Sequence, residues 1–138
     1  MTTEIEVIDI LTDPNHQINL RSAGKQRNLS SQVQNWFTEN GWEKEKSSFS
    51  IPEMKYYLVK ETIPIEIELG HQRLVFPYFF QFLADYSKEQ IPAAIMIVTG
   101  NPDSFGHNWH CSLQSTKRKI DAIREAFLVP LLLIAINP

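Results

Sequence analysis

The chain has 138 residues, of which 43% are hydrophobic, and this length and composition are typical of one globular domain with a sizeable core. Its net charge of −3 gives no global attraction to nucleic acid, so residues that bind DNA must gather on one face. The single cysteine excludes an internal disulfide and a zinc site built from cysteines. We expect a cytoplasmic protein, because the N-terminus shows no signal-peptide pattern and no apolar run is long enough to cross a membrane.

The first 27 residues form an N-terminal extension. Residues 1–11 fit either a short strand or the first turns of a helix, and their pattern does not decide between them. The rest of the extension is polar and holds the main basic cluster of this part of the chain: Arg21, Lys25 and Arg27. These side chains can contact DNA phosphates, and the alternative is a solvated loop.

A helix is predicted to begin near Asn28 and to end at Asn40-Gly41, a pair that favours a left-handed stop. Its apolar residues share one face: Leu29, Val33, Trp36 and Phe37. Residues 42–49 and 54–60 then read as strands, and a tight connection links the second of these to a strand over 63–69.

The strand over residues 63–69 alternates strictly between apolar and other residues. Glu66 and Glu68 share the face opposite its isoleucines, roughly 6–7 Å apart along the strand. Two carboxylates at this spacing can share a hard cation such as Mg²⁺. The alternative is a half-exposed strand with an acidic outer face.

The second half of the chain alternates helices and strands. Residues 72–88 have a helical period and little polar face, so we expect a largely buried helix, and the continuous apolar run 93–99 indicates a strand covered on both faces. A helix is predicted over 109–127 and a last buried strand over 129–136. This order indicates an α/β fold with a mixed central sheet flanked by helices on both faces.

Three passages resemble the PD-(D/E)xK nuclease core, and most closely type II restriction endonucleases of the BglII, BstYI and BamHI group. They are Ile65-Glu-Ile-Glu-Leu-Gly70, Phe79-Phe-Gln-Phe-Leu83 with the apolar run after it, and Phe127-Leu-Val-Pro-Leu-Leu-Leu-Ile134. The resemblance implies one restriction-endonuclease-like three-layer domain over 1–138, with its core at about 28–136. It also implies Mg²⁺-dependent cleavage of double-stranded DNA by a homodimer.

By this resemblance Glu66 binds the metal and Glu68 positions or activates the attacking water, whose pKa the metal lowers. The relatives carry an Asp about nine residues before Glu66, where this chain has Tyr57. The nearest acid on that side is Glu53, thirteen residues before Glu66. Either Glu53 completes a site with Glu66, or the site is inactive and the chain binds DNA or a protein partner without cleavage. In an inactive site, Tyr57 is expected to fill the space of the absent carboxylate.

The residues that directly follow the acidic strand are candidates for DNA contact. His71, Gln72 and Arg73 precede or open the next helix, where backbone N–H groups and positive charge favour phosphate. The alternative is a solvated turn and cap. His107 and His110 have no third metal ligand nearby in the sequence, and Cys111 is expected in the core. No motif supports a small-molecule enzyme.

Overall fold

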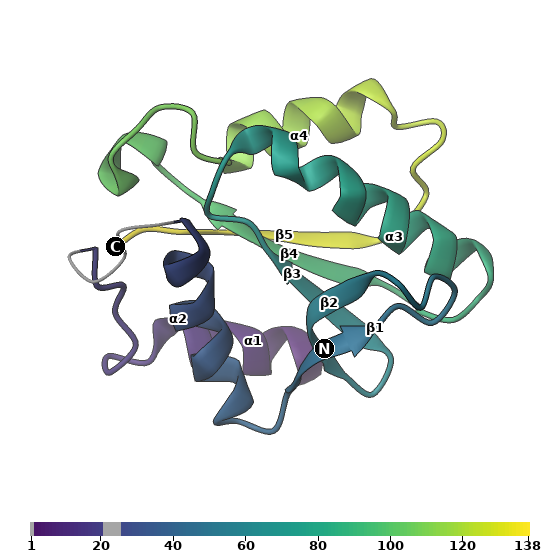
Figure 1. Cartoon of the computed structure of the whole chain (residues 1–138), viewed down its shortest axis with the longest axis horizontal. Helices are drawn as coiled ribbons and strands as arrows, with labels where there is room; N and C mark the ends of the chain where they lie inside the picture. The colour runs from purple at the N-terminus through teal and green to yellow at the C-terminus, as the bar shows by residue number, and fades with distance from the viewer. Residues whose placement is uncertain (1, 21–25) are drawn as a thin grey trace.

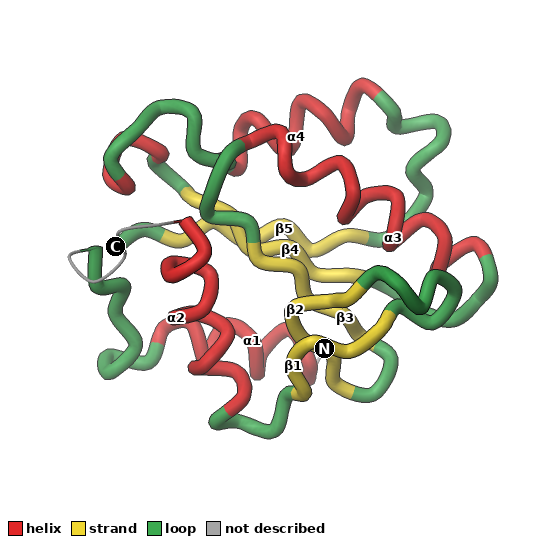
Figure 2. Tube along the Cα trace, in the orientation of Figure 1, coloured by secondary structure: helices red, strands yellow, loops and turns green. Residues whose placement is uncertain are grey.

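The computed structural model describes residues 2–20 and 26–138, and for residues 2 and 26–28 it describes the backbone only. Figure 2 shows the helices and strands along the chain. The helices are α1 (Thr2–Thr12), α2 (Gln26–Thr38), α3 (Phe76–Ser87) and α4 (Leu113–Ala122), with short 3₁₀ helices η1 (Gln72–Val75) and η2 (Pro102–Phe105). The strands are β1 (Glu43–Ser47), β2 (Lys55–Lys60), β3 (Ile63–Ile67), β4 (Ala94–Thr99) and β5 (Leu131–Ile136).

The five strands form one mixed sheet in the order β1-β2-β3-β4-β5. β1, β2 and β3 are antiparallel neighbours, whereas β3, β4 and β5 are parallel. The chain returns through α3 and then through α4 to reach the next parallel strand. Because such crossovers are right-handed and both step the same way across the sheet, both helices come to one face. Figure 1 shows α3 and α4 on that face and α1 and α2 on the other.

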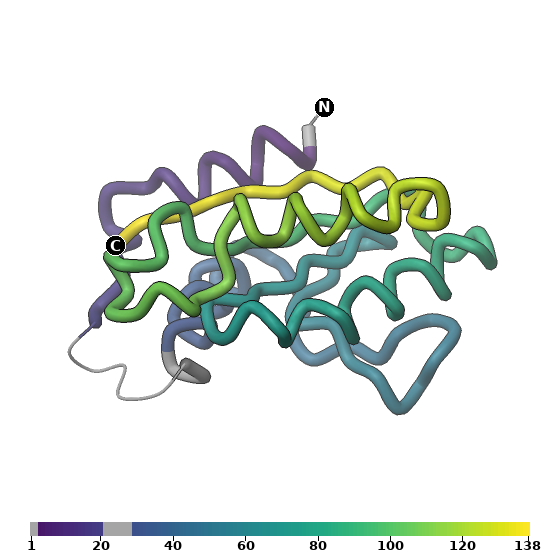
Figure 3. The backbone as a smooth tube through the Cα atoms, turned by 90° about the horizontal axis from the view of Figure 1, so that it is seen from above, coloured from purple at the N-terminus to yellow at the C-terminus, as the bar shows by residue number. Residues whose placement is uncertain are grey.

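Each face of the sheet has its own apolar core. Under α1 and α2 the buried residues include Val7, Val33, Phe37, Leu58, Ile65 and Ile67. Under α3 and α4 they include Tyr56, Phe79, Phe82, Met96 and Val98. Every residue of β4 is buried, which confirms the prediction of a strand covered on both faces. Figure 3 shows α1 running beside the C-terminal strand β5.

The structure settles or corrects several sequence predictions. Residues 2–12 are helical, and the helix predicted over 109–127 is shorter, because Ser112 caps its start. The expectation that residues 72–88 are largely buried is wrong on the outer face, where exposed fractions are 46% for Leu74, 53% for Phe76 and 62% for Phe80. β5 is a half-buried edge strand. No helix within residues 2–20 and 26–138 is both long and apolar enough to span a bilayer.

Candidate functional site

Glu66 and Glu68 lie at the C-terminal end of β3, and both are buried, with exposed fractions of 0% and 4%. The alternative of a half-exposed acidic strand is therefore wrong. Tyr78 of α3 reaches Glu68, so the second helical layer covers this end of the strand. Sequence alternation distinguished the two faces of the strand, but it could not show that a helix covers the acidic one.

Glu66 has one satisfied carboxyl oxygen and one that is not. Its Oε1 accepts a hydrogen bond of 2.8 Å from the backbone N–H of Tyr57. No residue that the structure describes hydrogen-bonds to its Oε2, although this atom is buried. Burial raises the pKa of Glu66 well above its ordinary value, the hydrogen bond from Tyr57 opposes the shift, and the charges of Glu68 and Glu45 add to it. The site therefore favours the neutral form of this carboxyl group.

Glu68 has both oxygens engaged. Oε2 accepts from the backbone N–H of Gly70 at 2.8 Å, and Oε1 accepts from the hydroxyl of Tyr78 at 2.9 Å. Burial raises the pKa of Glu68, and these two hydrogen bonds act against that rise. Burial also raises the pKa of Tyr78, and the nearby charge of Glu68 raises it further, so the hydroxyl stays protonated and donates.

Tyr57 closes the site from the neighbouring strand β2. Its ring packs edge-on against that of Tyr78, with 6.3 Å between the ring centroids. Glu45 on β1 has a left-handed φ of 57°, and the pairing of β1 with β2 is interrupted there. Side chains form hydrogen bonds with the backbone of Tyr57 instead. Glu66 accepts from its N–H, and Gln34 donates to its carbonyl oxygen at 2.9 Å.

Glu53 lies outside this arrangement. It is exposed in the turn between β1 and β2, four residues before Tyr57, which corresponds to about 13 Å of extended chain. The neighbouring charges that act on the pKa of Glu66 are those of Glu68 and Glu45. The structure thus brings Glu66 and Glu68 together but does not bring Glu53 to them, and this placement does not support Glu53 as a metal ligand.

The residues at this site do not fit a bound Mg²⁺ ion. Mg²⁺ needs near-octahedral oxygen ligands at about 2.0–2.1 Å. Within residues 2–20 and 26–138, no three His, Cys, Asp or Glu side chains are placed to hold a metal. Among the described residues, Glu66 has one oxygen without a hydrogen-bond partner, and Glu68 accepts one hydrogen bond on each oxygen. Two carboxyl groups alone supply too few ligands for an octahedral ion. Tyr57, whose backbone N–H bonds Glu66 from the neighbouring strand, carries no carboxylate.

The candidate DNA-contacting residues fall into two groups. His71 is half-buried, accepts from the backbone N–H of Arg73 through Nδ1 and stacks on Trp109, with 5.6 Å between ring centroids. Gln72 is half-buried and its backbone N–H donates to the Trp109 carbonyl, whereas Arg73 is exposed. These three residues lie together just after β3. In the second group, Arg21 and Lys25 lie outside the described residues, as does the side chain of Arg27 in the first turn of α2.

Sequence reasoning missed Tyr78 and Gln34 as parts of the site. Tyr78 lies in the segment 72–88 that is predicted to be a helix, and nothing local in the sequence signals that its hydroxyl reaches Glu68. Gln34 is buried on α2 and reaches Tyr57 across 23 positions of the chain. A polar residue next to the apolar stripe of a helix is a weak hint of such a contact.

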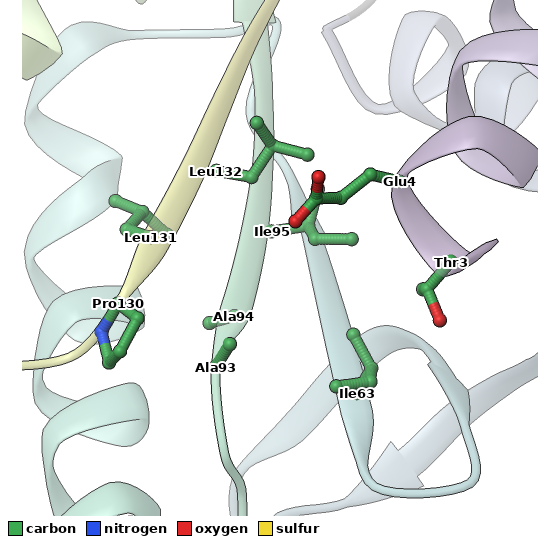
Figure 4. A pocket seen from close by; sticks show the side chains of 9 residues that line it. All are labelled: Thr3, Glu4, Ile63, Ala93, Ala94, Ile95, Pro130, Leu131 and Leu132. Carbon is green, nitrogen blue, oxygen red and sulfur yellow. The ribbon is translucent and has the colours of Figure 1, made fainter. Parts of the chain in front are cut away.

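Figure 4 shows a groove that neither Glu66 nor Glu68 lines. It is lined by the first residues of three parallel strands and by the start of α1: Ile63, Ala93, Ala94, Ile95, Pro130, Leu131, Leu132, Thr3 and Glu4. Because Glu66 and Glu68 lie at the C-terminal end of β3, this mainly apolar groove is at the opposite end of the sheet.

Comparison with known proteins agrees with the architecture. The model of the family "Restriction endonuclease BglII/BglIII" matches residues 2–136. The crystal structure of restriction endonuclease BglII complexed with a DNA 16-mer aligns with a TM-score of 0.68 and 12% identity, over 83% of this chain and 57% of that chain. This chain therefore spans a little over half of that protein's length. No curated protein matches the sequence. The fold is that of BglII, and the match over residues 2–136 shows that the chain belongs to the BglII/BglIII restriction endonuclease family.

Proposed function

We propose that this protein binds double-stranded DNA and does not cleave it with Mg²⁺ at Glu66 and Glu68. Family membership supports DNA as the ligand, because the aligned BglII structure is a DNA complex. The contact between Tyr57 and Glu66 supports the absence of cleavage. Tyr57 is aromatic and occupies the strand position beside Glu66 where a further metal-binding carboxylate would be required. We also propose that the protein is located in the cytoplasm, where it would encounter double-stranded DNA.

The distribution of charge supports a DNA-binding face despite the net charge of −3. α1 has three acidic residues and no basic one, whereas α4 carries Lys117, Arg118 and Lys119 beside a single acid, Asp121. α4 packs against η1, which contributes the exposed Arg73. Basic side chains gathered on one face supply the phosphate contacts on which non-specific DNA affinity depends.

Self-association as a homodimer belongs to the same proposal. The exposed side chains of Leu74, Phe76 and Phe80 form an apolar patch on the outer face of η1 and α3, and a patch of this kind often marks a protein interface. Static light scattering should give twice the mass of one chain. Phe80→Lys should reduce the mass toward that of a monomer, because it places a charge on the most exposed side chain of the patch. A monomeric wild-type protein would remove this part of the proposal.

A second candidate function is Mg²⁺-dependent endonuclease activity with Glu53, Glu66 and Glu68. The unpartnered Oε2 of Glu66 favours it, because a buried oxygen without a donor is suited to a cation. This function would require the exposed turn that carries Glu53 to move next to Glu66. The two candidates therefore differ in whether position 53 contributes to the site.

The test measures binding and cleavage separately. Anisotropy of a short fluorescein-labelled DNA duplex should show binding that weakens with salt, with a slope of roughly −0.9 per phosphate contacted. Arg73→Ala and Lys117→Ala should each reduce that slope by about one contact, while Glu4→Ala on the acidic helix should not change it. A supercoiled plasmid incubated with the protein and Mg²⁺ should remain intact.

Two outcomes would change the proposal. Plasmid cleavage that disappears in both Glu66→Gln and Glu53→Gln would establish the endonuclease candidate in its place. Absence of duplex binding at low salt would contradict both candidates, because each requires a complex with DNA. Single-stranded DNA as a competitor shows whether the duplex form is recognised.

A further inference from the structure

The unpartnered oxygen of Glu66 is the starting observation. Among the residues that the structure describes, Glu66 is fully buried, and yet its Oε2 has no hydrogen-bond partner. Buried polar atoms are nearly always paired, because leaving one without a partner costs free energy. A carboxyl group kept in this state needs a reason other than packing.

Two residues determine what could meet this oxygen. Glu68 follows two positions later on the same strand, and its charge acts on Glu66. On the neighbouring strand, Leu58 pairs with Ile65, and the next pair in this antiparallel register joins Tyr57 to Glu66. Cβ atoms of directly opposite residues lie about 4.5–5.5 Å apart. Position 57 is therefore the nearest place on β2 from which a side chain could reach Glu66.

We propose that the residues around Glu66 and Glu68 do not complete a divalent-cation site, and that Tyr57 is the residue that keeps the site incomplete. Ligand oxygens in an octahedral site with bonds of 2.0–2.1 Å lie roughly 3 Å apart. An aspartate at position 57 is short enough to place an oxygen beside Oε2 of Glu66. The tyrosine supplies no carboxylate oxygen there, and its backbone N–H bonds Oε1.

The hydrogen bonds of Glu68 do not prevent it from taking part. A carboxylate has about four acceptor positions, and the bonds from Tyr78 and Gly70 use one on each oxygen. The same bonds fix the orientation of Glu68, as outer groups do for ligands in built metal sites. The protein thus retains oriented oxygens for a cation and lacks one carboxylate.

The test is a gain of metal binding by one substitution. Isothermal titration of Tyr57→Asp with Mn²⁺ should show one saturable site, at least tenfold tighter than any binding to the wild-type protein. Tyr57→Asn is the matched control, because it removes the same ring and adds no charge, and it should bind no better than wild type. Adding Glu66→Gln to Tyr57→Asp should abolish the gained binding.

The inference extends the proposed absence of Mg²⁺-dependent cleavage, but it rests on the geometry of the site and its test contains no DNA. A failure to bind DNA would therefore leave it standing. A folded Tyr57→Asp protein that binds Mn²⁺ no better than Tyr57→Asn would overturn it. So would wild-type Mn²⁺ binding as tight as that of Tyr57→Asp and lost in Glu66→Gln, since the site would then already be complete.

A second measurement covers the case in which Tyr57→Asp does not fold, as judged by circular dichroism. Tb³⁺ bound near Tyr57 and Tyr78 would be excited through their rings, so its luminescence reports binding to the wild-type protein. We expect no saturable signal above that of Glu66→Gln, and this result supports the inference. A saturable signal that Glu66→Gln abolishes contradicts it.

Discussion

Asp85 on α3 and Glu66 on β3 are both completely buried carboxyl groups, but their surroundings differ. Asp85 accepts hydrogen bonds from four donors near the β1–β2 hairpin: the Ser48 hydroxyl, the Phe49 and Ser50 backbone N–H groups and the Tyr56 hydroxyl. Among the residues that the structure describes, Glu66 accepts one hydrogen bond, from Tyr57. Burial by itself raises the pKa of both, but the donors around Asp85 outweigh burial and lower its pKa.

This difference shows that the number of donors around a buried carboxyl group decides its charge, and that burial alone does not. Asp85 is held as a carboxylate and joins α3 to the loop after β1. Its role is structural, because every donor around it belongs to that hairpin. Glu66 has fewer donors among the described residues and its pKa is raised, as expected of a site that lacks a ligand.

Removing the charge of Asp85 should have the largest effect. Asp85→Asn keeps the shape of the side chain but turns one acceptor into a donor, which then faces the Ser48 and Tyr56 hydroxyls and the Phe49 N–H. We expect the free energy of unfolding to fall by about 3–5 kcal/mol, the usual cost of breaking a buried charge network. Urea denaturation measures it. The control is Asp121→Asn, an exposed partner of Arg124 at 3.9 Å, which should change stability by less than about 0.5 kcal/mol. Equal effects of the two variants would remove the structural role of Asp85.

The two groups should respond to pH with opposite signs. Because the pKa of Asp85 is lower in the folded state, its stabilisation is complete above its unfolded pKa of about 3.9 and is lost as pH falls through the folded value. The difference in stability between wild type and Asp85→Asn should therefore be large at pH 6 and should shrink as the pH falls below about 4. A difference that stays constant with pH would contradict the lowered pKa.

Tyr78→Phe should have an intermediate effect. It removes the hydroxyl that donates to Oε1 of Glu68 and leaves that buried oxygen without its donor. The expected loss is about 1–2 kcal/mol in urea denaturation, the usual cost of an unsatisfied buried group. Tyr86→Phe, a half-buried tyrosine on the same helix, is the control and should cost less. If both variants lost the same amount, the bond to Glu68 would have no separate importance.

Glu66→Gln should have the smallest effect, and its sign should depend on pH. Glutamine keeps an oxygen to accept from Tyr57, so at pH 5 we expect a change within about 0.5 kcal/mol. The folded pKa of Glu66 is raised, so its contribution is complete below its unfolded pKa of about 4.3 and is lost as pH rises toward the folded value. Between pH 5 and pH 8 the variant should therefore gain stability relative to wild type. A relative loss over this interval would mean that Glu66 is stabilised as an anion.

Local patterns in the sequence were sufficient for most of the fold. The alternation over 63–69 and the apolar run over 93–99 predicted β3 and β4, and the order of elements predicted the mixed sheet between helical layers. The resemblance built on the acidic strand also led to the family that the comparisons confirm. These predictions depend on the period of side chains within one element, which the sequence shows directly.

The contacts of the site could not be predicted in this way. The carboxylate of Asp85 meets Ser48 across 37 positions of the chain, and Tyr78 meets Glu68 where β3 passes beneath α3. The periodicity of side chains within one element does not indicate contacts between residues so far apart in the chain. The choice between Glu53 and Tyr57 as the residue beside Glu66 also depended on strand register, which placed Tyr57 there and left Glu53 in the turn.

The most direct test of the contrast is the charge of each carboxyl group in the folded protein. Carbon-13 NMR of side-chain carboxyls reports ionisation, and Glu66→Gln and Asp85→Asn assign the two signals. In a pH titration we predict that the Asp85 signal changes below the ordinary pKa of an aspartate and that the Glu66 signal changes above the ordinary pKa of a glutamate. A Glu66 signal that changes at or below the ordinary value would contradict the account, because Glu66 would then have a stabilising partner that this structure does not provide.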